Sequence, residues 1–193
     1  MSDTITDTMK QCLMQEAQAL MQLTSTINEK TLEFAQEIAD CKGKIVFTGV
    51  GKSYIVASKI AGTLSSIGVS CTHLDPLSML HGDLGFIDSD DMVIALSNSG
   101  ETNILIETLK CIASTDTRIL SITGNGNSTI AEMSYKTVEI KTEEAGPFGL
   151  VPTTSTTCIM AFGDAIACAM IQLKNLTIED FKRNHPNGEL SKI

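Results

Sequence analysis

Hydrophobic residues recur at helical spacing through about the first 40 residues, with Gln, Glu and Lys between them. The repeating positions are Ile5, Met9, Cys12, Leu13, Leu20, Ile27, Phe34 and Ile38. This spacing predicts an amphipathic helix from about residue 4 to 40. Thr24, Ser25 and Thr26 weaken the middle of the pattern, so two helices are the alternative. A long helix ahead of an α/β unit usually packs across the sheet or against another subunit.

Beyond Gly43 the pattern changes to short β-branched runs that alternate with helical stretches. The expected strands span 44–48, 70–73, 92–96, 118–122 and 137–140, and the expected helices span about 52–67, 102–113, 127–132, 153–174 and 178–183. Near-continuous Val, Ile and Leu runs are typical of parallel strands covered on both faces. We therefore predict an α/β fold with a doubly wound, five-stranded parallel sheet. A helical segment, 1–42, and a core, 43–193, would form one domain.

Composition narrows the classes of function. The 193 residues are 42% hydrophobic and 19% charged, as in ordinary globular proteins. The net charge of −9 is spread along the chain, whereas nucleic-acid binding needs a clustered basic face. The N-terminus lacks the layout of a signal peptide, and no apolar run approaches the ~20 residues of a membrane span. We expect a cytoplasmic protein that binds neither nucleic acid nor membrane.

Six cysteines lie far apart and mostly within apolar segments, at positions 12, 41, 71, 111, 158 and 168. No two of them have the C-x-x-C spacing of zinc or redox sites. We expect them to be small buried hydrophobic residues in a reducing compartment.

Polar segments follow three of the expected strands: 49–53, 97–102 and 143–147. Ligands of open parallel sheets bind beyond the carboxyl ends of the strands. The first segment fits neither a Walker A loop, since Val46 stands where Gly is needed, nor a dinucleotide fingerprint, since Tyr54 replaces Gly or Ala. It remains a Gly-rich turn with Lys52 and Ser53, suited to an anion at a helix N-terminus or simply to a structural turn.

The second segment concentrates polar side chains within one turn. Ser97, Ser99 and Thr102 carry hydroxyls and Asn98 an amide. Hydroxyls and main-chain N–H groups can form a phosphate cradle, and helix capping is the alternative. One cap needs only one such residue, so four favour a ligand. The threonine- and serine-rich run 153–157 is open to both readings, as a cap or as hydroxyls facing the ligand.

Histidine is scarce. His81 and His185 lie in polar, Gly-containing segments, whereas His73 ends an expected strand and is interpreted as structural or surface-exposed. A metal site built from His81 and His185 would need further ligands that the sequence does not provide. We therefore predict no metal and no cofactor.

Together these motifs resemble the sugar isomerase (SIS) domain family, and within it the arabinose-5-phosphate isomerases of the Kdo pathway. The matching segments are 49–53, 81–85, 97–101, 149–157, 163–165 and 185–188. The serine-rich segment 97–101 is shared by SIS domains broadly. The His-Gly-Asp-Leu-Gly and His-Pro-x-Gly elements are narrower and indicate the subfamily. The resemblance covers nearly the whole chain after about residue 10.

The resemblance implies a flavodoxin-like SIS fold, a small phosphorylated sugar as ligand, and roles for individual residues. The residues expected to bind the phosphate and the sugar are Gly51, Ser53, His81, Ser97, Asn98, Ser99, Thr102, Thr154 and Ser155. The catalytic set would be Lys52, Glu101, Glu144 and His185. Such domains form homodimers or homotetramers with sites at subunit contacts, so His185 is expected to serve a neighbouring subunit.

Two departures from the family pattern are present. Gly146 stands where members commonly have Cys, although the adjacent Glu144 is retained. Many members continue into a pair of CBS modules, and this chain ends at Ile193. We expect either a single-domain form or a shortened piece of a longer protein. The missing CBS modules put regulation by nucleotides in doubt, but not the isomerase reaction.

The expected reaction interconverts D-arabinose 5-phosphate and D-ribulose 5-phosphate through an enediol. Glu144 is the expected base, with Glu101 the alternative, and burial plus the phosphate would raise its pKa toward neutrality. Lys52 would stabilise the enediolate or contact the phosphate, and His185 would open the ring or move protons. A non-catalytic regulatory SIS protein and an isomerase of another sugar phosphate are the competing hypotheses.

Overall fold

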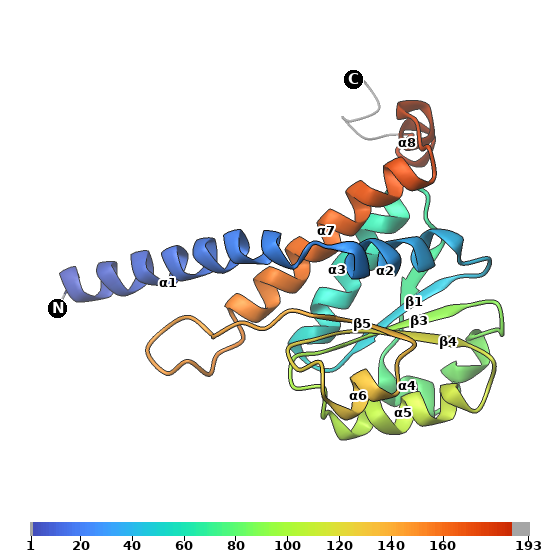
Figure 1. Ribbon diagram of the computed structural model, residues 1–193, viewed down its shortest axis with the longest axis horizontal. Coiled ribbons are helices and arrows are strands. Elements are labelled where there is room, and N and C mark those ends of the chain that lie inside the picture. The colour runs from blue at the N-terminus through green and yellow to red at the C-terminus, as the bar shows by residue number, and fades with distance from the viewer. Residues whose placement is uncertain (1, 187–193) are drawn as a thin grey trace.

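A computed structural model describes residues 2–186 and contains a five-stranded, all-parallel sheet (Figure 1). The strands are β1 (Ile45–Gly49), β2 (Cys71–His73), β3 (Met92–Ser97), β4 (Arg118–Thr123) and β5 (Lys136–Glu139). Their order in the sheet is β2-β1-β3-β4-β5, which is the flavodoxin-like order. Every strand begins and ends within one residue of its predicted bounds, so the predicted doubly wound sheet is confirmed.

Helices cover both faces of this sheet. On one face lie α2 (Glu29–Asp40), α3 (Lys52–Ser66) and α7 (Thr154–Leu173), and on the other lie α4 (Pro76–Leu80), α5 (Asn103–Ala113) and α6 (Thr129–Glu132) (Figure 1). Along β1, Ile45 and Phe47 pack toward the first face and Val46 toward the second. Because both faces are covered, the central strands β1, β3 and β4 are buried along almost their whole length, whereas the edge strands β2 and β5 are only partly buried.

The N-terminal segment consists of two helices, α1 (Ser2–Leu23) and α2, as in the alternative left open by the sequence. A 3-10 turn at Thr24–Thr26 separates them. In this turn the Thr24 and Ser25 hydroxyls each donate to the carbonyl three residues earlier, at 2.7 Å. Such bonds compete with helix continuation. Asn28 then caps α2 in a reciprocal capping box with Thr31.

The sequence pattern missed two short elements between β2 and β3, namely α4 and a 3-10 turn at Asp83–Phe86. Pro76 stands at the start of α4 and the Asp75 side chain accepts two N–H bonds there. Five residues are too few to show a helical period, so capping residues were the available signal.

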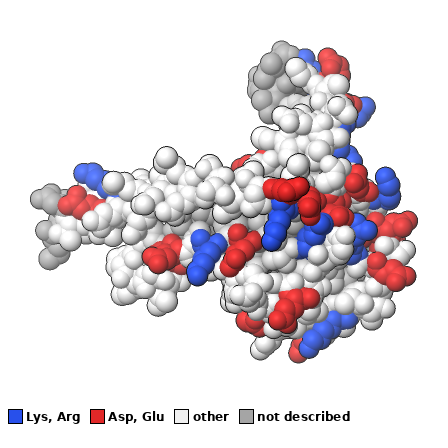
Figure 2. All heavy atoms as spheres, in the orientation of Figure 1, with Lys and Arg blue, Asp and Glu red and all other residues white. Residues whose placement is uncertain are grey.

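The first helix, α1, projects from the body while its C-terminal half contacts α7 (Figure 1). Its projecting surface is apolar and exposed, including Met9, Leu13, Met14 and Met21, the last with 76% of its surface exposed. Phe148, which is 80% exposed, and Leu150 add to this surface from the neighbouring 141–153 segment. Most visible charge lies over the body rather than along α1 (Figure 2). Exposed apolar surfaces of this kind are typical of contact sites between molecules.

The longest core helix, α7, is long and apolar enough to cross a membrane by length and composition alone. Part of its apolar surface belongs to the core, where Ile159, Phe162 and Met170 are buried among other apolar residues, whereas Met160 and Ile171 are exposed. Gly163 lets α7 approach α3 closely, since a Cβ at this position would lie 2.4 Å from Ile60 Cγ1.

The cysteine prediction was mostly wrong. All six thiols are free, and of them only Cys158 is buried. Cys111 and Cys168 are exposed because they fall on the solvent sides of α5 and α7, which the apolar context of the sequence did not reveal.

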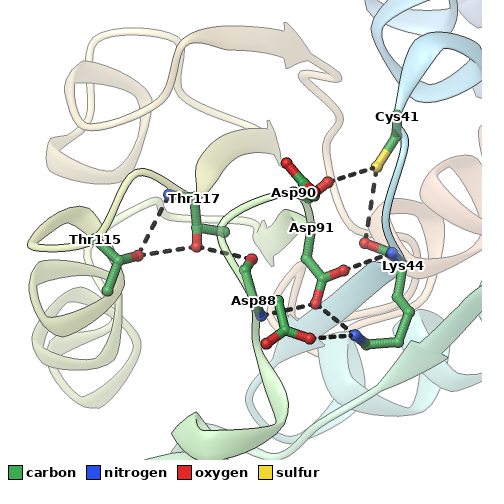
Figure 3. Close-up of polar contacts among 7 residues, drawn as sticks. All are labelled: Cys41, Lys44, Asp88, Asp90, Asp91, Thr115 and Thr117. Carbon is green, nitrogen blue, oxygen red and sulfur yellow. Dashed lines mark hydrogen bonds and ion pairs between the residues drawn. The ribbon is translucent and has the colours of Figure 1, made fainter.

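At the amino ends of β1 and β3, a buried carboxylate joins the two strands (Figure 3). Asp91, 3% exposed, accepts hydrogen bonds from the Lys44 N–H at 2.6 Å and the Asp88 N–H at 2.9 Å. It also pairs with Lys44 Nζ at 2.8 Å. This cluster lies at the edge of the sheet opposite the polar loops, so we interpret it as structural.

Candidate functional site at the carboxyl edge of the sheet

The loop after β1 leads into α3 through Gly51, whose φ of 61° favours glycine. Lys52 and Ser53 form the first turn of α3, and no side chain caps this helix within the described part of the chain. The backbone N–H groups of the first turn are therefore available to an anion, whose negative charge the helix dipole favours. A Cβ at Gly49 would lie 2.9 Å from Leu96 O, so this loop lies against the end of β3.

The loop after β3 divides its polar residues between two tasks. Ser97, 3% exposed, accepts a bond from the Gly100 N–H at 3.1 Å and shares a 2.9 Å bond with the Thr102 hydroxyl. These two residues therefore shape the turn. Asn98 and Ser99 are exposed at its surface, and the Ser99 hydroxyl also accepts the Glu101 N–H at 3.2 Å. Thr102 occupies the N-cap position of α5 but makes no side-chain cap bond. The capping alternative thus does not account for this cluster.

Glu144, in the segment after β5, is partly buried and lies at the first turn of α7. Its Oε2 accepts bonds from the Thr153 N–H at 2.9 Å, the Ser155 N–H at 3.1 Å and the Thr153 hydroxyl at 3.3 Å. The Ser155 hydroxyl bonds its Oε1. The Thr153 and Thr154 hydroxyls accept bonds from the Ala145 N–H, at 3.0 and 3.1 Å. Residues 153–155 therefore hold the glutamate segment.

These contacts correct the expected pKa of Glu144. Burial raises the pKa of this carboxyl, but the hydrogen bonds from Ser155 and Thr153 outweigh burial, and the pKa lies below its usual value. Burial acts in the predicted direction, but the sequence did not show that a helix start would donate to the carboxylate and lower its pKa.

Glu101, the alternative base, has a similar environment on another helix. Its carboxylate accepts bonds from the Thr129 N–H and hydroxyl, both at 2.8 Å, at the start of α6. These two bonds lower the pKa of the exposed Glu101 carboxyl.

One histidine ends β2 and another follows α4. His81 is exposed at the end of α4. His73 is half-buried at the end of β2, with its ring 5.3 Å from that of Tyr54.

His185 lies far from this edge within one chain. It ends α8 (Ile178–Asn184), and its ring stacks on Phe181 with centroids 4.1 Å apart. Asn184 of α8 donates to Ser66 O, at the far end of α3. The 15 residues of α3 span about 22 Å at ~1.5 Å per residue. His185 is thus roughly a helix length from Lys52. The motif residues Asn187 and Gly188 lie outside the described residues.

A cavity of about 640 Å³ adjoins Glu144 between α1, the 140–144 segment and α7. Gln15, Gln18 and Gln22 of α1 line it together with Glu144 and Cys158. No part in a site was expected of α1 from the sequence. The signal was present, since these glutamines recur at helical spacing on one face of α1.

A doubly wound parallel sheet with uncapped helix starts and a carboxylate at its carboxyl edge places the chain among α/β proteins whose sheet edge can accept an anionic ligand. This chain belongs to the SIS domain family, whose model matches residues 37–169. The resemblance stated from the sequence is therefore confirmed.

Curated relatives of this chain support the same family assignment. The arabinose 5-phosphate isomerase KpsF of Escherichia coli O6:H1 (strain CFT073) is 38% identical over 185 residues, covering 95% of this chain and 57% of the relative. KdsD of Yersinia pestis, of the same description, is 38% identical over 184 residues, covering 95% and 56%. The chain thus spans little more than half the length of these curated relatives.

Solved structures show the same fold. E. coli CFT073 c3406, in complex with arabinose 5-phosphate, matches with a TM-score of 0.91 and 35% identity, covering 96% of this chain and 98% of that one. A Listeria monocytogenes protein, lmof2365_0531, matches with a TM-score of 0.91 and 28% identity over the same shares.

Proposed function

We propose that this SIS domain is an aldose–ketose isomerase that interconverts D-arabinose 5-phosphate and D-ribulose 5-phosphate through an enediol intermediate. Relatives 38% identical over 95% of the chain carry the name arabinose 5-phosphate isomerase. A structure 35% identical was obtained with arabinose 5-phosphate bound. The observation that carries the proposal is an ionised carboxylate, Glu144, held at the same sheet edge as two helix starts that no side chain caps within residues 2–186.

The substrate phosphate binds at these helix starts. The N–H groups near Gly51 and Ser53 and the exposed Asn98 and Ser99 provide donors without a large positive charge. Ser97 and Thr102 contribute by shaping the turn. Lys52, exposed in the first turn of α3, offers a cation for the phosphate or for the enediolate oxygen.

Isomerisation needs a base that removes the proton from carbon 2 and returns it to carbon 1. The lowered pKa keeps Glu144 ionised at neutral pH, so it is ready to accept that proton. Glu101 is the rival base, although its exposure leaves it less shielded from water. His81 contacts the sugar hydroxyls in this proposal.

The site is completed by a second copy of the chain. His185 is about a helix length from Lys52 in its own subunit, and α1 with Phe148 and Leu150 exposes a broad apolar surface. A homodimer or homotetramer would cover this surface and bring one subunit's His185 to another's loops. We further propose that the protein is cytoplasmic and acts without nucleic acid or membrane.

The test follows ribulose 5-phosphate formation from arabinose 5-phosphate by NMR. We expect turnover by the wild type and a loss of at least ~100-fold in Glu144→Gln, since general-base catalysis contributes about that much. Glu101→Gln is the matched variant and should lose less. No turnover at high enzyme concentration contradicts the isomerase, and phosphate-sugar binding without turnover favours a regulatory protein. Equal losses in both variants contradict the choice of base.

A further inference from the structure

The two oxygens of the Glu144 carboxylate have different surroundings. Oε2 accepts the Thr153 N–H at 2.9 Å, the Ser155 N–H at 3.1 Å and the Thr153 hydroxyl at 3.3 Å. Within residues 2–186, Oε1 accepts a single hydrogen bond, from the Ser155 hydroxyl. A carboxylate oxygen offers about two lone-pair sites. Oε2 is therefore fully used, and Oε1 retains capacity for a further proton.

We infer that Thr153 and Ser155 are positioning residues for the Glu144 carboxylate, and that Oε1 is the atom that takes the substrate proton. The two N–H groups and the Thr153 hydroxyl fix Oε2, whereas the Ser155 hydroxyl orients Oε1. This inference rests on the proposed isomerase function, and it gives Ser155 a different role from the contact with the ligand that the family resemblance implied. Ser155 is 2% exposed and its hydroxyl is already bonded to Glu144, so it is not free to contact a phosphate.

The proton transfer balances without a further reactant. The bond between carbon 2 and its hydrogen breaks, and its electron pair remains on the sugar as the enediolate. The proton forms a bond with Oε1 and is later returned from Oε1 to carbon 1. In the enediol the proton of the carbon 2 hydroxyl passes to the oxygen on carbon 1, which leaves the carbonyl on carbon 2. Three donors at Oε2 disfavour protonation of that oxygen, which directs the proton to Oε1.

Other ionisable groups face this carboxylate. Lys141 and Glu143 lie in the same segment and line the same cavity. Cys158 of α7 lies close, since burial first and then the charges of Glu16 and Glu144 raise the pKa of its thiol. None of these groups is substituted in the test below, so their effect on the pKa of Glu144 is the same in every variant.

The test compares Ser155→Ala with Thr156→Ala in the full chain. Thr156 lies on the same turn, but its hydroxyl donates to Thr153 O at 2.9 Å rather than to Glu144. In Ser155→Ala we expect kcat to fall about tenfold, because the base is less well oriented, with KM changed less than about twofold. The acid limb of the kcat/KM profile should move up by about 0.5 to 1 pH unit, since a donor to the charged form is lost. Thr156→Ala should change neither quantity, and Thr153→Ser, which keeps a hydroxyl, should retain the wild-type profile.

A raised KM with an unmoved acid limb in Ser155→Ala would overturn the inference and assign Ser155 to the phosphate. A second measurement separates this failure from failure of the proposed reaction. Carboxyl-labelled glutamates are titrated by ¹³C NMR without substrate, with Glu144→Gln identifying the signal of Glu144. The midpoint must rise in Ser155→Ala and stay in place in Thr156→Ala, whether or not the wild type isomerises arabinose 5-phosphate. An unchanged midpoint in folded Ser155→Ala overturns the positioning role.

Discussion

Replacing Asp91 by Asn removes the charge that joins the starts of β1 and β3. The carboxylate accepts the Lys44 and Asp88 N–H groups and pairs with Lys44 Nζ (Figure 3). In the Asp91→Asn variant one oxygen is replaced by an NH₂ group, which donates and cannot satisfy these donors. Breaking a fully buried pair costs about 3–5 kcal/mol. The side chain of Lys44 is 32% exposed and its ammonium can be rehydrated, so we expect a loss of about 2–3 kcal/mol.

Urea unfolding at pH 7, followed by circular dichroism, measures this loss as a lower midpoint at unchanged slope. In thermal unfolding, ~2–3 kcal/mol corresponds to a Tm lower by roughly 4–12 °C for a chain of this size. Asp88→Asn is the matched control: it also pairs with Lys44 Nζ, at 3.1 Å, but its side chain is 77% exposed. Its effect should be a small fraction of that of Asp91→Asn.

The contribution of Asp91 to the free energy of unfolding should depend on pH, and its sign follows from the shift in the Asp91 pKa. Burial raises the pKa of Asp91, but hydrogen bonds and the charge of Lys44 outweigh it and the pKa is lowered. A lowered folded-state pKa stabilises the fold above the unfolded-state value of about 3.9, and this stabilisation is lost as the pH falls through the folded-state value. The difference in unfolding free energy between wild type and Asp91→Asn should therefore shrink below about pH 4. Equal stability of wild type, Asp91→Asn and Asp88→Asn at pH 7 would refute the reasoning.

Two further predictions concern packing and assembly. Gly163→Ala should lower the free energy of unfolding, measured in urea, by about 1–3 kcal/mol, because the added Cβ would clash with Ile60. Gly62→Ala is the control: a Cβ there would have no atom within 4 Å, so the variant should be neutral or more stable. Equal effects of the two substitutions would contradict the close packing of α3 and α7. Leu13→Ser combined with Met14→Ser should lower the mass measured by light scattering and weaken activity, whereas Lys10→Ser should do neither. An unchanged mass in the double variant would contradict a subunit contact through α1.

Much of the fold follows from local sequence patterns. The central strands β1 and β3 are buried on both faces, so each is largely apolar in sequence. The break between α1 and α2 at Thr24–Thr26 coincides with three consecutive hydroxyl residues. The sequence pattern did not predict α4, because this helix is too short to show a helical period. It also did not predict side-chain exposure where exposure depends on which side of a helix faces the core. Cys111 and Cys168 are examples of the second case.

The sequence predicted which segments lie together at the candidate site, but not which side chains in them form hydrogen bonds with one another. Parallel strands place their carboxyl ends at one edge, which is why the three polar loops lie there. The division of tasks within the loop after β3 depends on which hydroxyl is buried, and Ser97 and Ser99 are not distinguishable by residue type. The sequence also did not predict that His185 lies far from the polar loops of its own chain, because its position depends on where α8 packs against the end of α3.

The two glutamates show how the tertiary structure determines the chemistry of a residue. Each accepts bonds from the start of a helix, Glu101 from Thr129 and Glu144 from Thr153 and Ser155. Such donors hold a carboxylate in one orientation and also stabilise its charged form, so a gain in orientation lowers intrinsic basicity. In the proposed reaction, an ionised, oriented base of this kind would obtain its rate from placement and from stabilisation of the enediolate by Lys52 rather than from a raised pKa. Lys52→Met should therefore lower kcat in the proposed reaction while leaving the acid limb set by Glu144 in place, and a shifted limb would contradict this division of roles.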